Sequence, residues 1–326
     1  PRRLAISDQG ANTARWGGDG NLYFLSGKSG TSQVWRVASP TAAPVQVTSL
    51  PLDVNAYRLS PSADKVAVSL AVYPDAADLN ASVETGKAVA ERKTTGQVYD
   101  RMFVRHWDTW NDHTQNHLFV QSIGRDGRAT GQPVWVTKGF DGDTPSKPFG
   151  DESDFTFTPA GDAVVFSARL AGQTEPWSTN FDLWKTNGLT GDGTFTNLTA
   201  DNPAGDAGPV VSPDGRRAVA QVLDGTVGLW MLDLERRALT PFLAHIPTRQ
   251  HPVAPQFGQP HMEIEPARTA RVVDANGLAV GQRDLAHGDA DVLVDLALDI
   301  DAGGGGELLG GMGLERGLGI GDHEIR

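Results

Sequence analysis

The sequence has 326 residues and a net charge of −12 at pH 7, so it lacks the surplus of Lys and Arg that phosphate binding requires, and no nucleic-acid partner is expected. It contains no cysteine, which excludes disulfides and thiol catalysis but leaves both cytoplasm and periplasm open for a soluble protein. No apolar run approaches the roughly 20 residues that span a bilayer, so no membrane partner is expected.

A turn followed by a strand recurs four times along the chain. Each copy places Pro or Gly beside Asp and continues into a β-rich apolar run, at 18–25, 60–70, 158–166 and 212–222. A further strand with a bulky residue follows each run, at 33–37, 117–121, 181–185 and 227–231. Short closing strands follow at 44–48, 133–137, 195–199 and, more loosely, 237–240. With the strand before each turn, the unit has four strands and recurs about every 45 to 50 residues, a spacing typical of propeller blades.

The fold predicted from this repeat is all-β: a partial β-propeller of about four four-stranded blades, with one helical insertion and a Gly-rich, poorly ordered tail. Each blade needs a neighbour to cover its apolar faces. A β-sandwich is the alternative, but a sandwich does not need a Pro/Gly-Asp turn at a fixed place. The blades are assigned to 1–245 and are expected to be incomplete at both ends, since 1–5 resemble a closing strand without its blade. A self-sufficient ring of four blades is a further alternative.

One bulky residue recurs at the same position of every blade. Because the position repeats with the blade, these side chains are predicted to form the core between blades and not a carbohydrate platform. They are Trp35, Phe119, Trp184 and Trp230.

The second unit carries an insertion at 73–116, between its second and third strands. Leu79, Val83 and Ala90 recur at helical spacing within 76–93, which predicts a short helix interrupted by Gly86. The rest of the insertion is rich in aromatic and charged residues.

A compact set in this insertion is the candidate binding site, for a peptide or a facing domain. The alternative is an insertion packed on its own blade, with an ion pair between the acidic and the first basic member. The set is Arg105, His106, Asp108 and Trp110.

No metal and no cofactor is predicted. His113 and His117 have the spacing of two helical zinc ligands, but the alternating apolar run that begins at His117 predicts a strand, and the Glu of H-E-x-x-H is missing. The acidic residues between 289 and 299 lack the D-x-D-x-D-G order of a calcium loop. The glycines at 303–306 lack the Lys of a phosphate loop.

Residues 246–326 form a separate low-complexity tail. This stretch has almost no aromatic residues and none of the blade repeat, so it has little apolar area to offset the entropy of ordering. An out-of-frame translation of GC-rich DNA would give such an abrupt change. A genuine linker or a small separate domain is the alternative.

The run 97–110, followed by the strand at 117–120, resembles the N-terminal propeller of S9 (prolyl oligopeptidase) serine peptidases of the acylaminoacyl-peptidase and dipeptidyl-peptidase type. The resemblance covers 1–245. It implies a propeller that caps an α/β-hydrolase domain and admits small or unfolded peptides, with the catalytic Ser, Asp and His later in the chain.

The sequence departs from that family where catalysis is concerned. It contains no G-x-S-x-G nucleophile motif, and no Ser follows Ser212. No catalytic residue is therefore assigned, the chain is predicted to be inactive alone, and a peptide substrate is expected only through a missing hydrolase domain. The alternative is a TolB-like protein-binding module without enzymatic activity. The sequence predicts no oligomeric state.

Overall fold

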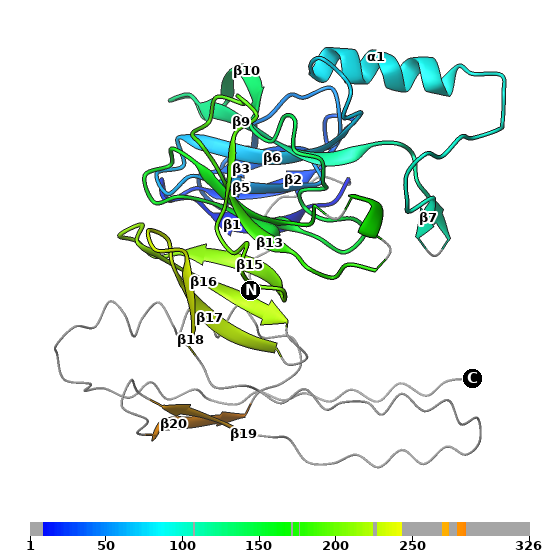
Figure 1. Ribbon diagram of the computed structural model, residues 1–326. Helices are drawn as coiled ribbons and strands as arrows, with labels where there is room; N and C mark the ends of the chain where they lie inside the picture. The colour runs from blue at the N-terminus through cyan, green and yellow to red at the C-terminus, as the bar shows by residue number, and fades with distance from the viewer. Residues whose placement is uncertain are drawn as a thin grey trace, which may run out of the picture. The chain divides into compact units, whose positions relative to one another are not determined.

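The computed structural model describes residues 9–242, except 107, 171, 176 and 224–226, and the backbone of two further strands. Four sheets of four strands make up most of the described chain, in a propeller arrangement (Figure 1). In each sheet the strands are antiparallel and follow one another in chain order. This confirms the predicted partial propeller.

The four sheets are numbered here as blades 1 to 4 in chain order. Blade 1 consists of β1 (Asn12–Trp16), β2 (Leu22–Ser26), β3 (Gln33–Val37) and β4 (Val45–Gln46). Blade 2 consists of β5 (Ala56–Leu59), β6 (Lys65–Val72), β9 (Gln115–Ile123) and β10 (Ala129–Trp135). Blade 3 consists of β11 (Phe155–Phe157), β12 (Val164–Ala168), β13 (Asp182–Thr186) and β14 (Phe195–Asn197). Blade 4 consists of β15 (Gly205–Val211), β16 (Arg217–Leu223), β17 (Val227–Asp233) and β18 (Ala238–Pro241).

The repeated turn between the first two strands is held by the same hydrogen bonds in blades 2, 3 and 4. A Ser or Thr begins the turn, and its hydroxyl donates to the Asp carboxylate that the sequence repeat contains. These bonds are Ser60–Asp64 (2.7 Å), Thr158–Asp162 (2.7 Å) and Ser212–Asp214 (2.6 Å). The repeated Asp is therefore a turn-forming residue, as such residues commonly are.

Two residues after the closing strand of blades 1, 2 and 3 comes a buried threonine, the capping threonine, that holds the third strand. Its hydroxyl accepts the backbone N–H of the residue before the repeated bulky side chain. The three bonds are Val34 N to Thr48 Oγ1 (2.9 Å), Leu118 N to Thr137 Oγ1 (2.9 Å) and Leu183 N to Thr199 Oγ1 (3.0 Å). The threonine of the repeated Val-Thr or Leu-Thr pair is therefore explained by the hydrogen bond that its hydroxyl accepts.

Blade 4 departs from this pattern. Leu229 O accepts the N–H of Phe242 (2.9 Å), as Leu183 O accepts that of Leu198 (2.7 Å). Thr240, taken from the sequence as the end of the closing strand, is exposed and donates to Met231 O instead. Among the described residues of blade 4, no threonine takes the place of the capping threonine.

Apolar clusters join each blade to the next. One cluster contains Tyr23 and Val34 of blade 1 with Tyr57 and Phe119 of blade 2. A second joins blades 2 and 3, and a third joins blades 3 and 4. Hydrogen bonds also cross the interfaces: Tyr57 Oη donates to Thr13 O at 2.8 Å. The core therefore lies between the sheets, as the covering argument predicts.

The repeated bulky residues occupy one register position, opposite a residue of the second strand. The pairs are Phe24–Trp35, Val68–Phe119, Phe166–Trp184 and Ala220–Trp230. Phe119 is buried in the cluster between blades 1 and 2, and Trp184 packs on the second cluster, which confirms the prediction for these two residues. Trp35 is also buried, but its cluster contains only residues of blade 1. Trp230 is half-buried and lines a pocket, so the prediction of a filled core was wrong at this position.

The insertion leaves blade 2 after β6 and returns at β9 (Figure 1). It contains the helix α1 (Leu79–Ala90), whose N-cap Asp78 accepts the N–H of Ala81 at 2.8 Å. The helix confirms the prediction, but Gly86 does not interrupt it. A glycine in a helix costs only about 1 kcal/mol, which the helix tolerates. The small hairpin of β7 (Arg105–His106) and β8 (Thr109–Trp110) follows.

Two short 3-10 helices, η1 (Glu152–Asp154) and η2 (Gly172–Thr174), belong to blade 3 and its approach. In the predicted tail, the structure describes only the antiparallel pair β19 (Thr269–Val273) and β20 (Ala279–Asp284). The predicted boundary at 245, the acidic residues at 289–299 and the glycines at 303–306 lie outside the described residues, as do residues 1–5.

The close approach of blades 1 and 2 predicts a steric effect at Gly18. A Cβ atom there would lie 2.0 Å from Pro61 O, whereas a Cβ at Gly27 would meet nothing within 4 Å. We expect Gly18→Ala to destabilise the protein by about 1–3 kcal/mol and Gly27→Ala to change stability by less than about 0.5 kcal/mol, measured by urea unfolding. Equal unfolding midpoints for the two variants would show that blades 1 and 2 do not approach each other closely at Gly18.

Candidate functional site

The predicted site residues lie on the hairpin β7–β8. Its register pairs Arg105 with Trp110 and His106 with Thr109, which places residue 107 and Asp108 in the turn. Residue 107 is outside the described residues. The structure therefore brings the four predicted residues into one small element, but it divides them between the strands and the turn.

Arg105 and Trp110 interact directly across the hairpin. The Arg105 guanidinium carbon lies 5.4 Å from the centre of the Trp110 ring, which is the geometry of a cation–π contact. Trp110 remains 59% exposed. Within the described residues Arg105 forms no ion pair with Asp108, because the turn carries Asp108 away; its carboxylate accepts the Thr109 hydroxyl at 3.3 Å. The alternative interpretation predicted an ion pair between Arg105 and Asp108, and that prediction was wrong.

Aromatic residues that the sequence analysis did not single out complete this surface. Tyr99 stacks on Trp110 with ring centroids 6.2 Å apart and on His113 at 5.1 Å. Its hydroxyl donates to Asn111 O at 3.1 Å. These residues lie beside the hairpin because the chain turns back on itself. No spacing in the sequence indicates this contact. Tyr99, Trp110 and His113 therefore form one aromatic cluster at the hairpin.

His106 points to a second segment of the chain. Its ring lies 6.3 Å from Phe103 and 5.7 Å from Phe149, edge to face in both cases. Phe149 belongs to the stretch 136–151 between blades 2 and 3, which is called here the 2–3 connector. His106 thus joins the hairpin to the body of the protein and is not displayed with Trp110.

Charged contacts tie the base of the insertion to the same connector. The Arg101 guanidinium pairs with both oxygens of Asp141. Lys147 Nζ donates to Thr114 O at 2.8 Å and lies 3.6 Å from Asp112. Exposed pairs of this kind contribute little stability each, but together they restrict the position of the insertion.

Two buried titratable groups lie where the insertion returns to blade 2. Asp143 accepts the N–H of Asn116 at 2.7 Å, and burial raises the pKa of its carboxyl to about 6. His117 is buried on β9 with its Nδ1 3.0 Å from Thr137 Oγ1, and burial lowers the pKa of its imidazole to about 4. His117 is therefore held neutral by the blade, whereas His113 is exposed.

The described residues contain no group of three His, Cys, Asp or Glu that could hold a metal ion. In the same residues no helix is long and apolar enough to cross a membrane. Contacts at the hairpin and its surroundings include a cation–π contact, ring stacking and hydrogen bonds.

The chain has relatives among curated proteins but matches no protein-family model. It is 29% identical over 221 residues to a dipeptidyl-peptidase 5 of Porphyromonas endodontalis and 30% identical over 182 residues to a dipeptidyl-peptidase 4 of Giardia intestinalis. These matches cover 66% and 51% of this chain but only 30% and 24% of the relatives. The chain thus spans about a quarter to a third of their length.

Among solved structures, an acylaminoacyl peptidase of Pyrococcus horikoshii is similar at 11% identity, with a TM-score of 0.44 over 71% of this chain and 32% of that one. The sheets define a chain of propeller blades. The sequence relatives confirm the predicted resemblance: the matched part of the chain is related to dipeptidyl-peptidases of the S9 family.

The raised pKa of Asp143 predicts a pH-dependent stability. A carboxyl whose pKa is higher in the folded than in the unfolded protein stabilises the fold at low pH, and this contribution is lost as pH rises from about 4 through 6. Asp143→Asn keeps the acceptor for Asn116 but removes the buried charge. We expect this variant to be more stable than the unaltered protein by about 2 kcal/mol at pH 7.5 and by much less at pH 4.5.

The measurement is urea unfolding at both pH values, with Asp75→Asn as a control because Asp75 is exposed. The control is expected to shift by the same small amount at both pH values. A stability difference for Asp143→Asn that does not change with pH would show that Asp143 is not held protonated in the fold.

Proposed function

We propose that the four blades are part of the non-catalytic, substrate-gating propeller of an S9 serine peptidase that cleaves small peptides. The observation that carries this proposal is the relationship to dipeptidyl-peptidases over 66% of the chain. The described residues form four blades, and the sequence contains no G-x-S-x-G motif in which a serine nucleophile could be activated. Hydrolysis would take place on an α/β-hydrolase domain that these residues do not form.

The hairpin surface supplies the contact chemistry in this proposal. Trp110 contacts both Arg105 and Tyr99, and it lies on the insertion between the second and third strands of blade 2. Exposed aromatic rings beside Arg are typical of residues that carry binding energy. We assign this surface to contact with the peptide substrate or with the hydrolase domain that faces the blades.

The purified chain is predicted to show no peptidase activity. Without nucleophile, base and oxyanion hole, acyl transfer has no mechanism. A chromogenic dipeptidyl p-nitroanilide is the substrate to use, with and without an inhibitor of serine hydrolases. Inhibitor-sensitive release of p-nitroaniline by the purified chain would refute the non-catalytic assignment.

A chimera tests the gating function itself. The aligned 221-residue segment of the Porphyromonas endodontalis relative is replaced by the matching segment of this chain. We expect the chimera to cleave a dipeptidyl p-nitroanilide and to leave uncleaved a folded protein that displays the same cleavage site. A folded chimera that cleaves both substrates equally well would refute the gate.

The hairpin surface is tested in the same chimera by Trp110→Ala. Removing a contact worth about 1 kcal/mol is expected to lower kcat/KM for the small substrate about fivefold. Trp16→Ala is the matched control, because Trp16 is 75% exposed but ends β1, at the opposite end of the strands from the insertion. Equal kcat/KM for the two variants would show that the hairpin makes no functional contact.

A further inference from the structure

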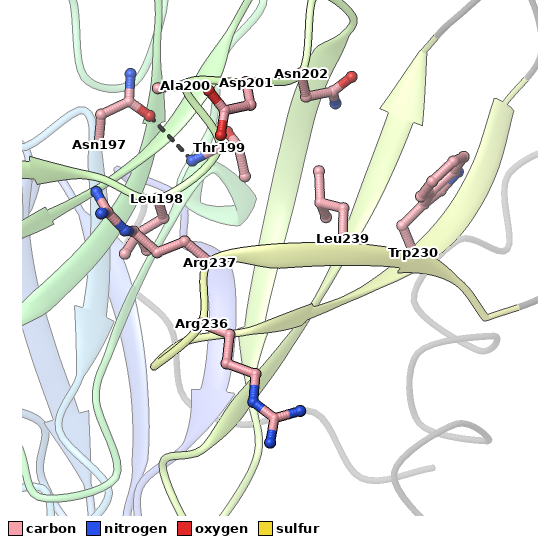
Figure 2. Close-up of a pocket in the computed structure, with 10 residues that line it drawn as sticks. All are labelled: Asn197, Leu198, Thr199, Ala200, Asp201, Asn202, Trp230, Arg236, Arg237 and Leu239. Atoms are coloured by element: carbon pink, nitrogen blue, oxygen red, sulfur yellow. Dashed lines mark hydrogen bonds between the residues drawn. The ribbon is translucent and has the colours of Figure 1, made fainter.

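A pocket of about 410 Å³ lies between blades 3 and 4 (Figure 2). Its volume lies within the range of small-ligand sites. The lining combines two apolar side chains of blade 4 with polar groups from the stretch after β14 and from the turn between β17 and β18. The lining residues are Asn197, Leu198, Thr199, Ala200, Asp201, Asn202, Trp230, Arg236, Arg237 and Leu239.

Aromatic rings fill the corresponding place between blades 2 and 3. Phe140 of the 2–3 connector packs edge to face against Phe166, Trp184 and Phe195, with ring centroids 5.1, 5.2 and 5.2 Å away. Phe140 and Phe166 are fully buried. The four rings form a solid plug on the face of blade 3 that meets blade 2.

Strand register identifies the blade 4 counterparts of these rings. Trp230 pairs with Ala220, as Trp184 pairs with Phe166. Leu239 lies opposite Leu232, two residues beyond Trp230, as Phe195 lies opposite Thr186, two residues beyond Trp184. Blade 4 therefore keeps the Trp but has Ala and Leu where blade 3 has two Phe.

The connector supplies the third replacement. Phe140 donates its N–H to Thr137 O at 3.1 Å, and Asn202 donates its N–H to Thr199 O at 2.8 Å in the equivalent turn. Asn202 thus takes the place of Phe140. Its side-chain amide donates to Asp206 Oδ1 at 2.7 Å, so it is engaged with blade 4 and does not fill the space over Trp230. The pocket is the volume that three phenyl rings occupy one blade earlier.

Trp230 also has an unused hydrogen-bond donor. The equivalent indole N–H groups donate to backbone carbonyls: Trp35 to Ser26 O at 3.1 Å and Trp184 to Ala168 O at 3.3 Å. Trp230 Nε1 donates to none of the described residues. A half-buried tryptophan usually finds a partner for this group, so a ligand that enters the pocket gains both ring contact and a hydrogen bond.

The charged residues of the lining are two arginines and one aspartate, Asp201, so the net charge of the lining is positive. In Figure 2, Arg237 extends toward Asn197 and Leu198, Arg236 points away, and Leu239 lies between Arg237 and Trp230. Arg236 lies 4.0 Å from Asp233, whereas Arg237 forms no ion pair with any described residue. Arg237 is therefore available to bind a carboxylate, which its guanidinium matches in geometry.

We propose that this pocket binds a short extended peptide segment that carries an aromatic side chain and a carboxylate. The aromatic ring lies on Trp230 in the place that Phe140 takes over Trp184, and the carboxylate pairs with Arg237. Arg237 precedes Ala238, which pairs with Asp233 of the neighbouring strand. Asp233 lies three residues beyond Trp230, so Trp230 and Arg237, at the two ends of the pocket, are about 10 Å apart along the strand. A peptide of three or four residues spans this length, and a single aromatic acid does not.

The binding test uses the full chain and two tetrapeptides of opposite direction, acetyl-Phe-Gly-Gly-Glu-amide and acetyl-Glu-Gly-Gly-Phe-amide, in isothermal titration calorimetry. We expect one of the two to bind. In that peptide, replacing Phe by Ala or Glu by Gln is expected to raise Kd at least fivefold each. No binding of either peptide, or equal Kd values for all forms, would overturn the proposal.

Variants locate the binding in the pocket. Arg237→Gln is expected to abolish the difference between the Glu and Gln peptides, and Arg236→Gln, whose side chain points away, is expected to preserve it. Leu239→Phe restores the ring that Phe195 provides in blade 3 and is expected to raise Kd for the Phe peptide at least fivefold. If the Kd values of the Glu and Gln peptides still differ for Arg237→Gln, the proposed site is refuted. Arg237 is on the surface, so this test remains valid even if Leu239→Phe does not fold.

Discussion

The covering of one blade's apolar face by the next blade is the interaction on which the rest of this structure depends. A four-stranded sheet with two apolar faces cannot exclude water alone, so each blade is stable only where a neighbour packs on it. The clusters between blades 1 and 2, 2 and 3, and 3 and 4 meet this requirement with different side chains in one register. The turn hydroxyls and the capping threonines hold that register in place.

The 2–3 connector shows how the same constraint positions the insertion. Phe140, at its first turn, fills the face of blade 3, while Asp141, Asp143, Lys147 and Phe149 contact the insertion. One segment therefore serves both the core and the candidate contact surface. A change that loosens blade 3 would also release the base of the hairpin, so the position of Trp110 depends on packing that lies well away from it.

The interfaces between blades share one register but differ in the side chains that fill them. Because register is set by the backbone hydrogen bonds between strands, single residues can change the contents of an interface without changing its register. Three replacements turn the aromatic plug of blade 3 into the pocket of blade 4.

The sequence by itself determined the blade repeat, the turns, the helix in the insertion and the family relationship, because strand alternation, turn residues and helical spacing are local properties. It also located the segment that carries Arg105 and Trp110. Only the tertiary structure decided that Arg105 meets Trp110 and not Asp108, that Tyr99 and Phe149 join this surface, and that Trp230 borders a pocket while Trp184 does not. Those outcomes depend on residues contributed by other segments, such as Asn202 in place of Phe140, and contacts between distant segments have no signal in the spacing of a single chain.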